Sequence, residues 1–329
     1  MTQAIKIGLV GTGYWGKNLL RNFDALGALG AFCDTSEKAR KAFSEMYPKA
    51  KPYKDIADML ASPEIEAVAI STPAATHGEL ARLALEAGKH VFVEKPLCLD
   101  CEEGEALRRL AESKGLILMV GHLLLYHSAF LALKEELSKG TLGKLRYIVS
   151  NRLSLGKIRR EENALWSFAP HDISMILNLV GSMPVRVSAN GGSYLSQNVA
   201  DTTLSHLTFD DGIQAHIFVS WLNPFKDQKL VVIGSEAMAV FDDVNQGPEK
   251  LLLYRHDVRW DGQVPTINKA EAKAIPYAAA EPLRSECQHF LECVKAKARP
   301  RSDAQEGLNV LKVLDACQRS LTSGEPVTI

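Results

Sequence analysis

Two segments of this chain are best suited to chemistry: a glycine-rich turn, GTGYWG at residues 11–16, and the triplet EKP at residues 94–96. The glycine turn is typical of dinucleotide binding, and the triplet ends an apolar run in the same half of the chain. In a dinucleotide-binding domain, the reactive ring of the cofactor lies at the carboxyl ends of the strands. The two segments therefore predict redox chemistry on a hydroxyl or carbonyl group, with Lys95 beside the reacting carbon.

Lys95 is suited to two catalytic roles. It could donate a hydrogen bond to the substrate oxygen and stabilise developing alkoxide charge, or relay a proton if burial lowers its pKa. The alternative is a solvated lysine that follows a strand. We favour a catalytic role because Glu94 and Pro96 flank the lysine at the strand end, and we place Glu94 beside the cofactor as well.

The glycine turn follows an N-terminal apolar strand and opens a helix, which is the context that dinucleotide binding requires. Gly11 permits the tight turn, Gly13 lets the backbone approach the pyrophosphate, and Gly16 lets the helix pack on the strand. Tyr14 and Trp15 lie within the same turn. The free N–H groups of the helix N-terminus then face the diphosphate.

Asp34 ends the second predicted strand, about 20 residues after the glycine turn, where an acid bonds the ribose hydroxyls of the adenosine. A 2′-phosphate would meet this carboxylate, and no arginine follows at once, because the next residues are Thr35 and Ser36. The sequence therefore predicts NAD rather than NADP, with Asp34 and Thr35 as cofactor contacts. The alternative is that Asp34 only marks the entry to a helix.

His171 is the candidate general base. It follows Pro170, which is tolerated in the first turn of a helix, and an apolar helical pattern continues after it. We therefore expect His171 at a helix N-terminus, where the dipole keeps the ring neutral and fit to accept a proton. Asp172 is one position away and points elsewhere on a helix. The alternative is a capping or core histidine.

Further cofactor contacts are expected after two other strands. The segment STPAATH at residues 71–77 supplies Ser71, Thr72, Pro73 and His77, and His122 follows the last parallel strand. Both histidines could contact the nicotinamide half of the cofactor, and His122 could instead mark the domain boundary.

The stretch RLSLGKIRREEN at residues 152–163 is basic and polar. Lys157, Arg159 and Arg160 lie close together there, and cations of this kind can hold a substrate phosphate. We expect Arg159 to contact the substrate diphosphate and Asn163 to bond the sugar. The alternative is a solvated loop in which the cations pair with the neighbouring glutamates.

The elements that position these residues change character along the chain. Up to residue 122, apolar strands alternate with helices, which predicts parallel βαβ units in a Rossmann domain. From residue 123 to 329, short strands joined by tight turns predict a largely antiparallel sheet in a second α/β domain, closed by helices at 284–297 and 305–321. The expected fold is α/β throughout, with a substrate-binding and oligomerisation domain after the NAD-binding one.

Bulk properties limit the function classes. The formal net charge of -1 over 329 residues supplies no basic field for nucleic acid. Neither a secretory signal nor a run of about 18 apolar residues is present, so we expect a cytoplasmic protein without a membrane span. The six cysteines are scattered, which favours reduced thiols, and Cys98 and Cys101 lack the second pair that a zinc site needs. No metal is expected.

These motifs together resemble the Gfo/Idh/MocA oxidoreductase family over nearly the whole chain. The resemblance rests on GTGYWG, Asp34, STPAATH, VEKPL, the Gly121-His122 pair, the helix with His171 and the ending SGEPVTI. It implies a Rossmann domain, a second domain with an open, mostly antiparallel sheet, and homodimers or homotetramers that pack those sheets together. It also implies catalytic roles for Lys95 and His171, and a cis peptide at Pro96.

The segments GYWGKNLLRNF and EENALWSFAPHDIS are similar to a branch of this family that acts on nucleotide sugars, the UDP-N-acetylglucosamine 3-dehydrogenases of lipopolysaccharide synthesis. That likeness implies a UDP-sugar substrate and a 3-keto product that an aminotransferase consumes. Many members carry an aspartate where Ser167 stands, so a Lys–Asp–His arrangement cannot be transferred. Dehydrogenation of a UDP-linked uronic acid or an inositol, and non-catalytic NAD binding, are the alternatives.

Overall fold

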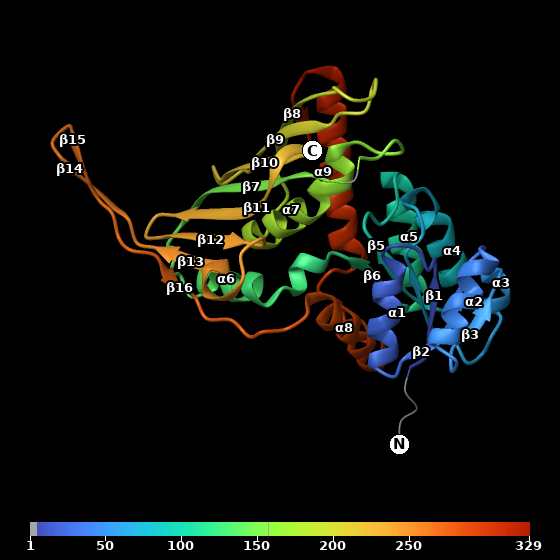
Figure 1. The fold of residues 1–329 in the computed structure, drawn as a ribbon. Coiled ribbons are helices and arrows are strands. Elements are labelled where there is room, and N and C mark those ends of the chain that lie inside the picture. The colour runs from blue at the N-terminus through green and yellow to red at the C-terminus, as the bar shows by residue number, and fades with distance from the viewer. Residues whose placement is uncertain (1–4, 157) are drawn as a thin grey trace. The chain divides into compact units, whose positions relative to one another are not determined.

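The computed structural model describes residues 5–156 and 158–329, which divide into two compact units. One unit joins the residues up to Tyr126 with Glu281–Leu311, and the other joins His127–Ala280 with Lys312–Ile329. The sequence analysis placed one boundary at residue 122 and did not predict that Glu281–Leu311 belongs to the first unit. No motif in the last 50 residues indicates which unit they join. Figure 1 shows the elements of both units along the chain.

The first unit is built on six parallel strands in the order β3-β2-β1-β4-β5-β6. Their bounds are β1 Ile7–Val10, β2 Leu29–Cys33, β3 Lys51–Tyr53, β4 Ala67–Ile70, β5 His90–Glu94 and β6 Leu118–Gly121. Every residue of β1 and β4 is buried, which is why both segments are continuous apolar runs. The strand order reverses between β1 and β4, the point where open sheets of this type bind ligands.

Helices α1 to α5 and α8 belong to this unit, with α1 Gly16–Ala25, α2 Glu37–Met46, α3 Ile56–Leu60, α4 His77–Glu86, α5 Cys101–Lys114 and α8 Pro282–Ala296. Ser36 caps α2 as predicted, because its hydroxyl accepts the N–H of Ala39. The short 3₁₀ turns are η1 Ala74–Thr76 and η2 Leu123–Tyr126. Helix α8 returns to pack beside α1, and its Phe290 ring lies edge-on to Phe92 of β5.

The second unit contains a nine-stranded sheet in the order β16-β13-β12-β11-β7-β10-β9-β8-β17. Its strands are β7 Leu145–Leu155, β8 Arg186–Gly192, β9 Thr202–Thr208, β10 Gln214–Ser220, β11 Leu222–Gly234, β12 Met238–Asp242, β13 Leu251–Tyr254, β16 Lys273–Ala274 and β17 Val327–Thr328. Only the β7–β10 pair among these described strands is parallel, so the predicted open, mostly antiparallel α/β architecture is confirmed.

Helix α7, Ala164–Val180, contacts β7, β9 and β10, and helix α6, Ser128–Ser138, contacts β12. Helix α9, Ala304–Ser323, runs through the end of one unit into the other, and η3 is Gly247–Lys250. A separate two-stranded ribbon, β14 Asp257–Asp261 with β15 Val264–Asn268, was not predicted. No helix in the ranges 5–156 and 158–329 is long and apolar enough to cross a membrane.

Candidate functional site

The glycine turn has the geometry that a pyrophosphate needs. Gly11 has φ +87°, a conformation that favours glycine. A Cβ on Gly16 would lie 2.0 Å from the carbonyl oxygen of Gly11, so only glycine lets α1 begin this close to β1. A Cβ on Gly13 would meet nothing within 4 Å, which leaves open space over the turn where α1 presents its N-terminus. The residues present therefore fit a dinucleotide.

Asp34 is held firmly at the end of β2. Its Oδ2 accepts hydrogen bonds from the Thr12 N–H (2.9 Å) and the Thr12 hydroxyl (2.6 Å), and its Oδ1 accepts the N–H of Ser36 (2.9 Å). Burial acts to raise the pKa of Asp34, but these hydrogen bonds outweigh it and hold the pKa below its ordinary value. The carboxylate is thus ionised and joined to the glycine turn, as recognition of ribose hydroxyls requires.

Arg40 was missed by the sequence analysis. Its guanidinium donates to the carbonyl oxygens of Asp34 (2.7 Å) and Thr35 (2.9 Å), so it braces the loop after β2. Thr35 itself is exposed. The signal was weak, since Arg40 lies six residues after the acid and one turn inside α2.

The loop after β4 is tied to its neighbours by Ser71 and His77. The Ser71 hydroxyl donates to the carbonyl oxygen of Gly11 at 2.7 Å. His77 is buried, and its ring lies 2.7 Å (Nδ1) from the carbonyl oxygen of Pro96 and 2.9 Å (Nε2) from that of Thr72. It therefore links the STPAATH loop to the EKP loop. Contact of His77 with nicotinamide, and of the exposed Pro73 with the cofactor, stays a prediction.

Lys95 is partly buried directly after the carboxyl end of β5, and its peptide bond to Pro96 is cis, as the family resemblance implied. The preceding Glu94 accepts a hydrogen bond from the indole N–H of Trp15. Burial raises the pKa of Glu94 to about 7, against the opposing effects of Trp15, Lys95 and His122. The glycine turn and the EKP loop are thus joined through the Trp15–Glu94 hydrogen bond.

A second group of acids lies behind this loop. The His122 ring is buried and its Nδ1 lies 2.5 Å from a carboxylate oxygen of Glu306. Glu286 of α8 is fully buried, and neither carboxyl oxygen has a hydrogen-bond partner. Burial, followed by the charges of Glu94 and Glu306, raises the pKa of Glu286 well above its ordinary value, which favours the neutral acid.

Glu286 and Glu306 were not found from the sequence because their segments lie far downstream of the motifs. A signal was available: Glu286 shares the apolar face of α8 with Leu283, Cys287 and Phe290, all buried. A lone carboxyl on such a face is unusual unless it is paired or protonated.

The second unit corrects the prediction for His171. Helix α7 begins at Ala164, so His171 lies in its interior and not at its N-terminus. Asn163 is the N-cap, because its Oδ1 accepts the N–H of Trp166 (3.1 Å) while its amide donates to Gln318 (2.8 Å). Pro170 lies within the helix and does not begin it. The dipole argument for a neutral ring therefore does not apply, while the role of His171 as a base stays a prediction.

Arg152 also differs from expectation. Strand β7 continues to Leu155, so Arg152 belongs to the sheet and not to the basic loop. Its guanidinium meets the fully buried Asp172 at 2.8 and 3.2 Å, and Ser150 donates to the same carboxylate at 2.6 Å. This group fastens α7 to β7 at the helix turn that carries His171.

Within the loop, the half-buried Arg159 pairs with Glu162 at 3.1 Å, an internal ion pair of the kind weighed as the alternative. Lys157 lies outside the described residues. Ser167, where many members of the resembled family have an aspartate, is buried in α7. The substrate roles of Arg159 and Asn163 stay predictions.

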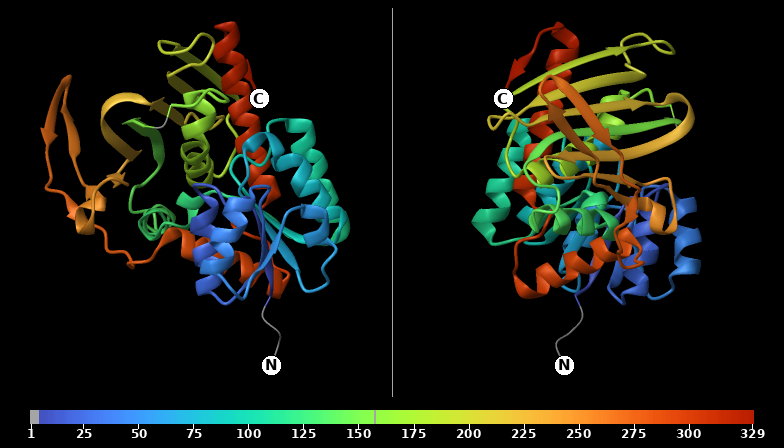
Figure 2. Two further views of the ribbon diagram at one scale, coloured as in Figure 1. Left: turned by 45° about the vertical axis from the view of Figure 1, so that its right-hand side comes forward. Right: turned by 90° about the vertical axis from the view of Figure 1, so that its left-hand side faces the viewer.

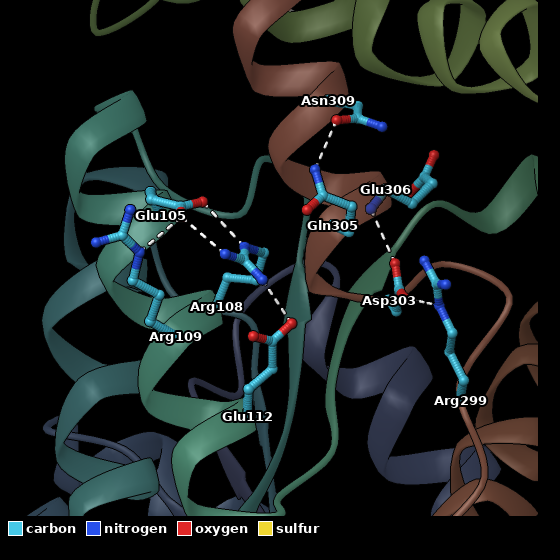
Figure 3. Close-up of polar contacts among 9 residues, drawn as sticks. All are labelled: Glu105, Arg108, Arg109, Glu112, Arg299, Asp303, Gln305, Glu306 and Asn309. Atoms are coloured by element: carbon cyan, nitrogen blue, oxygen red, sulfur yellow. Dashed lines mark hydrogen bonds and ion pairs between the residues drawn. The ribbon is translucent and has the colours of Figure 1, made fainter. Parts of the chain in front are cut away.

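A pocket of about 370 Å3 also lies in the first unit, lined by residues of α5, β6 and the segment before α9. Its two arginines are already paired: Arg108 with Glu105 and Glu112, and Arg299 with Asp303 (Figure 3). The pocket contains none of the predicted site residues. Among the residues that the structure describes, no group of three or more His, Cys, Asp or Glu side chains is arranged to hold a metal, and all six cysteines are free.

Comparison with known proteins identifies two family domains. Residues 5–122 match the oxidoreductase family with an NAD-binding Rossmann fold, and residues 130–240 match the GFO/IDH/MocA C-terminal domain. Together these regions cover more than half of the chain.

Similar proteins include dehydrogenases of sugars and polyols. The UDP-N-acetylglucosamine 3-dehydrogenase of Acidithiobacillus ferrooxidans is 29% identical over 93% of this chain and 94% of its own length. Its solved structure has a TM-score of 0.84, covering 97% of this chain and 98% of that one at 25% identity. The scyllo-inositol 2-dehydrogenase (NADP(+)) IolW of Bacillus subtilis is 27% identical over 97% of this chain and 94% of its own.

The WlbA dehydrogenase of Bordetella pertussis, solved with NADH and UDP-GlcNAcA, shares the fold with a TM-score of 0.81 at 22% identity, over 99% of each chain. The matched domains, the 3-2-1-4-5-6 strand order and the glycine turn agree on one cofactor, NAD, and on oxidoreductase chemistry. The chain belongs to the Gfo/Idh/MocA family of NAD-binding oxidoreductases.

Proposed function

We propose that this protein oxidises the C3 hydroxyl of UDP-N-acetylglucosamine to a ketone with NAD+. The observation that carries the proposal is the match to the Acidithiobacillus 3-dehydrogenase along 93% of the chain, together with Lys95 at the end of β5. The reaction converts the sugar and NAD+ to the 3-keto sugar, NADH and one proton. Bound NAD+ supplies the acceptor for the hydride that leaves C3.

The proton of the 3-hydroxyl needs a base, and the alkoxide that forms needs a donor. In our proposal His171 takes the proton and Lys95 donates to the oxygen, where a positioned cation lowers the energy of developing negative charge. The opposite assignment of the two roles has the same atom balance. Arg159 contacts the diphosphate and Asn163 bonds the sugar.

Around the cofactor, we propose that the glycine turn, with Tyr14 and Trp15, faces the pyrophosphate, and that Asp34 and Thr35 bond the adenosine ribose. Ser71, Thr72, Pro73, His77, Glu94 and His122 then surround the nicotinamide half. We further place the reaction in the cytoplasm of a lipopolysaccharide-producing cell, in a homodimer or homotetramer. The 3-keto sugar would be consumed by an aminotransferase.

The test is mass spectrometry of UDP-GlcNAc after incubation with the purified protein and NAD+. Glutamate and a sugar aminotransferase are added to draw the oxidation forward. UDP-linked GlcNAc uronic acid and scyllo-inositol are assayed in parallel, the latter two by NADH formation. A UDP-amino sugar from UDP-GlcNAc, with the amine located at C3 by NMR, is the expected result.

Lys95→Ala should retain NAD+ binding and lose at least about 100-fold in turnover, since one donor to a developing oxyanion contributes roughly that much. Lys89→Ala is the matched control, because Lys89 lies before β5 rather than after it and its ammonium donates to the backbone carbonyls of Ser62 and Ile65. Near-normal turnover of Lys95→Ala would exclude its catalytic role.

Inositol or uronate oxidation is the second candidate, favoured by the likeness to IolW over nearly the whole chain. Product from scyllo-inositol or the uronate alone would move the assignment to that substrate. Bound NAD that is never reduced by any of the three would favour a regulator that binds the cofactor without catalysis.

A further inference from the structure

Three carboxyl groups of the first unit lie together behind the EKP loop: Glu94 of β5, Glu286 of α8 and Glu306 of α9. They form a carboxyl cluster, in which the negative charges of Glu94 and Glu306 act on Glu286. Glu286 reaches the cluster because α8, drawn in orange-red, returns beside the blue α1 (Figures 1 and 2). Glu306 projects from the first turn of α9 (Figure 3). Segments that are far apart in the chain thus build one cluster.

Glu94 lies at the carboxyl end of β5, and its side chain is held from two sides. Its Oε1 accepts the indole N–H of Trp15, and a Cβ on Gly121 would lie 3.0 Å from its Oε2. Gly121 is the partner of Glu94 in the sheet and ends β6. The carboxyl group is thus held between the glycine turn and the backbone of β6, at the edge of the sheet where open α/β folds bind their ligands.

The other two carboxyl groups differ in their surroundings. Glu286 is fully buried, and neither of its oxygens has a hydrogen-bond partner. Glu306 is partly buried, and one of its carboxylate oxygens lies 2.5 Å from Nδ1 of the buried His122. The charged and titratable groups around the cluster include Lys95 after β5, His122 after β6, Tyr126 of η2, Cys287 of α8 and, over the ring of Tyr126, Arg301 before α9.

Charge repulsion inside the cluster favours protonation. Three ionised carboxyl groups would set three negative charges against Lys95 and, when it is protonated, His122, and like charges this close oppose one another's ionisation. Burial without a hydrogen-bond partner favours the neutral acid at Glu286. Burial also raises the pKa of Glu94, but the Trp15 hydrogen bond and Lys95 oppose that effect and leave it at about 7. Glu94 is therefore the member of the cluster whose charge changes most readily near neutral pH.

The charge of the cofactor can shift this balance. A nicotinamide ring is positive in NAD+ and neutral in NADH. At an effective dielectric constant of about 20, a positive unit charge about 6 Å away lowers the pKa of a carboxyl group by roughly 2. A cation in front of Glu94 therefore favours the carboxylate, and loss of that cation favours the acid.

We propose that Glu94 takes up one proton when the bound cofactor changes from NAD+ to NADH, while Glu286 stays protonated in both states. This proposal rests on the position of Glu94 beside the nicotinamide in the proposed function, and not on which sugar is oxidised. Oxidation of the substrate sends a hydride to NAD+ and a proton to the base, and Glu94 binds an equivalent proton. That proton returns to solvent when NADH is replaced by NAD+.

Isothermal titration calorimetry of the purified protein with NAD+ and with NADH tests the proposal without any sugar. Titrations at pH 7 in phosphate, Hepes and Tris, which differ in ionisation enthalpy, give the number of protons bound with each cofactor. Wild type should bind about 0.5–0.8 proton more with NADH than with NAD+, the difference expected when the pKa of Glu94 moves by roughly 2 around neutral pH. Equal proton numbers for the two cofactors would overturn the proposal.

Glu94→Gln should reduce the difference between the cofactors to about zero, because the amide oxygen can still accept the Trp15 N–H but cannot take up a proton. Glu286→Gln is the matched control, since it replaces a neutral acid by a neutral amide, and it should keep the difference of wild type. A difference that persists in Glu94→Gln, or one that is lost in Glu286→Gln, would place the proton elsewhere and overturn the assignment. Circular dichroism verifies that each variant is folded.

The ratio of the two dissociation constants gives a test that needs no variant. Because NADH binds with the extra proton, its affinity relative to that of NAD+ should fall by about 10- to 30-fold between pH 6 and pH 8. A ratio that is constant with pH overturns the proposal even if Glu94→Gln binds neither cofactor. Failure to oxidise UDP-GlcNAc leaves all these readouts unchanged, so the two proposals fail separately.

Discussion

At the residue scale, Asp34 and Glu286 show how environment sets the charge of a carboxyl group. Asp34 accepts three hydrogen bonds and stays ionised. The carboxyl oxygens of Glu286 have no hydrogen-bond partner, and burial on α8 raises the pKa of this group well above its ordinary value. The first can bind ribose hydroxyls, and the second makes the stability of the first unit depend on pH.

Replacement of Asp34 by alanine should weaken NAD+ binding by about 10- to 100-fold, because hydrogen bonds to a charged group contribute about 1.5–3 kcal/mol. Binding of NADP+ should weaken less or improve, since the carboxylate no longer opposes the 2′-phosphate. Calorimetry gives the Kd for NAD+ and the Kd for NADP+, and the ratio of the two is compared between variant and wild type. Thr12→Val, which removes one hydrogen bond to Asp34 but keeps the charge, serves as the control, and an unchanged ratio in Asp34→Ala would contradict the assignment.

Replacement of Glu286 by glutamine should remove a pH dependence of stability. The folded chain holds this proton more tightly than the unfolded chain, whose pKa is near 4.5. The stabilisation from Glu286 is thus complete below pH 4.5 and is lost as the pH rises toward the higher folded pKa. Relative to wild type, the free energy of unfolding of Glu286→Gln should rise by up to about 1.4 kcal/mol for each pH unit in that window.

Urea unfolding of both proteins at pH 5 and pH 7.5, followed by far-ultraviolet circular dichroism, measures this difference. Glu292→Gln, on an exposed part of the same helix, is the control and should show no such trend. A difference between Glu286→Gln and wild type that is constant with pH would mean that the buried carboxyl is already ionised.

At the element scale, the position at which α7 begins sets the structural roles of Asn163 and His171. Asn163 ends the basic loop and caps the helix, and the helix then carries His171 in its interior. The buried Arg152–Asp172 pair holds the helix against β7 at the turn that carries His171. The orientation of His171 therefore depends on helix packing rather than on a helix terminus.

Asn163→Ala should lower stability by about 1 kcal/mol through loss of the cap. Asn163→Ser retains a capping oxygen and should stay closer to wild type in thermal unfolding. If Asn163 also bonds the sugar, the serine variant should still show a raised KM for UDP-GlcNAc, because the amide is gone. A KM equal to wild type in Asn163→Ser would restrict Asn163 to capping.

At the scale of the whole molecule, each of the two units is built from two stretches that are separated in the sequence. The chain passes from one unit to the other after Tyr126, Ala280 and Leu311. The NAD-binding unit therefore depends on α8, which is made more than 150 residues after its last strand. An enzyme of this design cannot complete its first unit before nearly the whole chain is present.

Phe290→Ala should test this dependence. The ring is fully buried and lies 5.8 Å from that of Phe92, so its removal should lower the free energy of unfolding by about 3–5 kcal/mol. NAD+ binding should be lost at a lower urea concentration than in wild type. Phe225→Ala, at a site 65% exposed in the other unit, should change stability by less than about 0.5 kcal/mol. Equal urea midpoints of Phe290→Ala and Phe225→Ala would argue against a structural role for α8 in the NAD-binding unit.

Local patterns were sufficient for the parallel strands and cofactor-binding turns of the first unit, but not for the return of Glu281–Leu311 to it. The glycine turn, the acid after the second strand and the EKP loop are short-range signals, because the positive φ of Gly11 and the ends of buried strands are set by neighbouring residues. The alternation of apolar strands and helices likewise predicted the parallel sheet, and the short strands with tight turns predicted the mixed one.

The sequence by itself thus determined the fold class, the NAD-binding turn and the placement of Lys95 after a buried strand, since each depends on periodicity or on steric limits within a few residues. Only the tertiary structure decided that α7 begins at Ala164, that Arg152 is buried against Asp172, and that Glu286 of α8 lies near enough to Glu94 and Glu306 for their charges to raise its pKa. These contacts join segments that are far apart in the chain. Their energies come from burial and from charges that meet only after folding, so no local pattern encodes them.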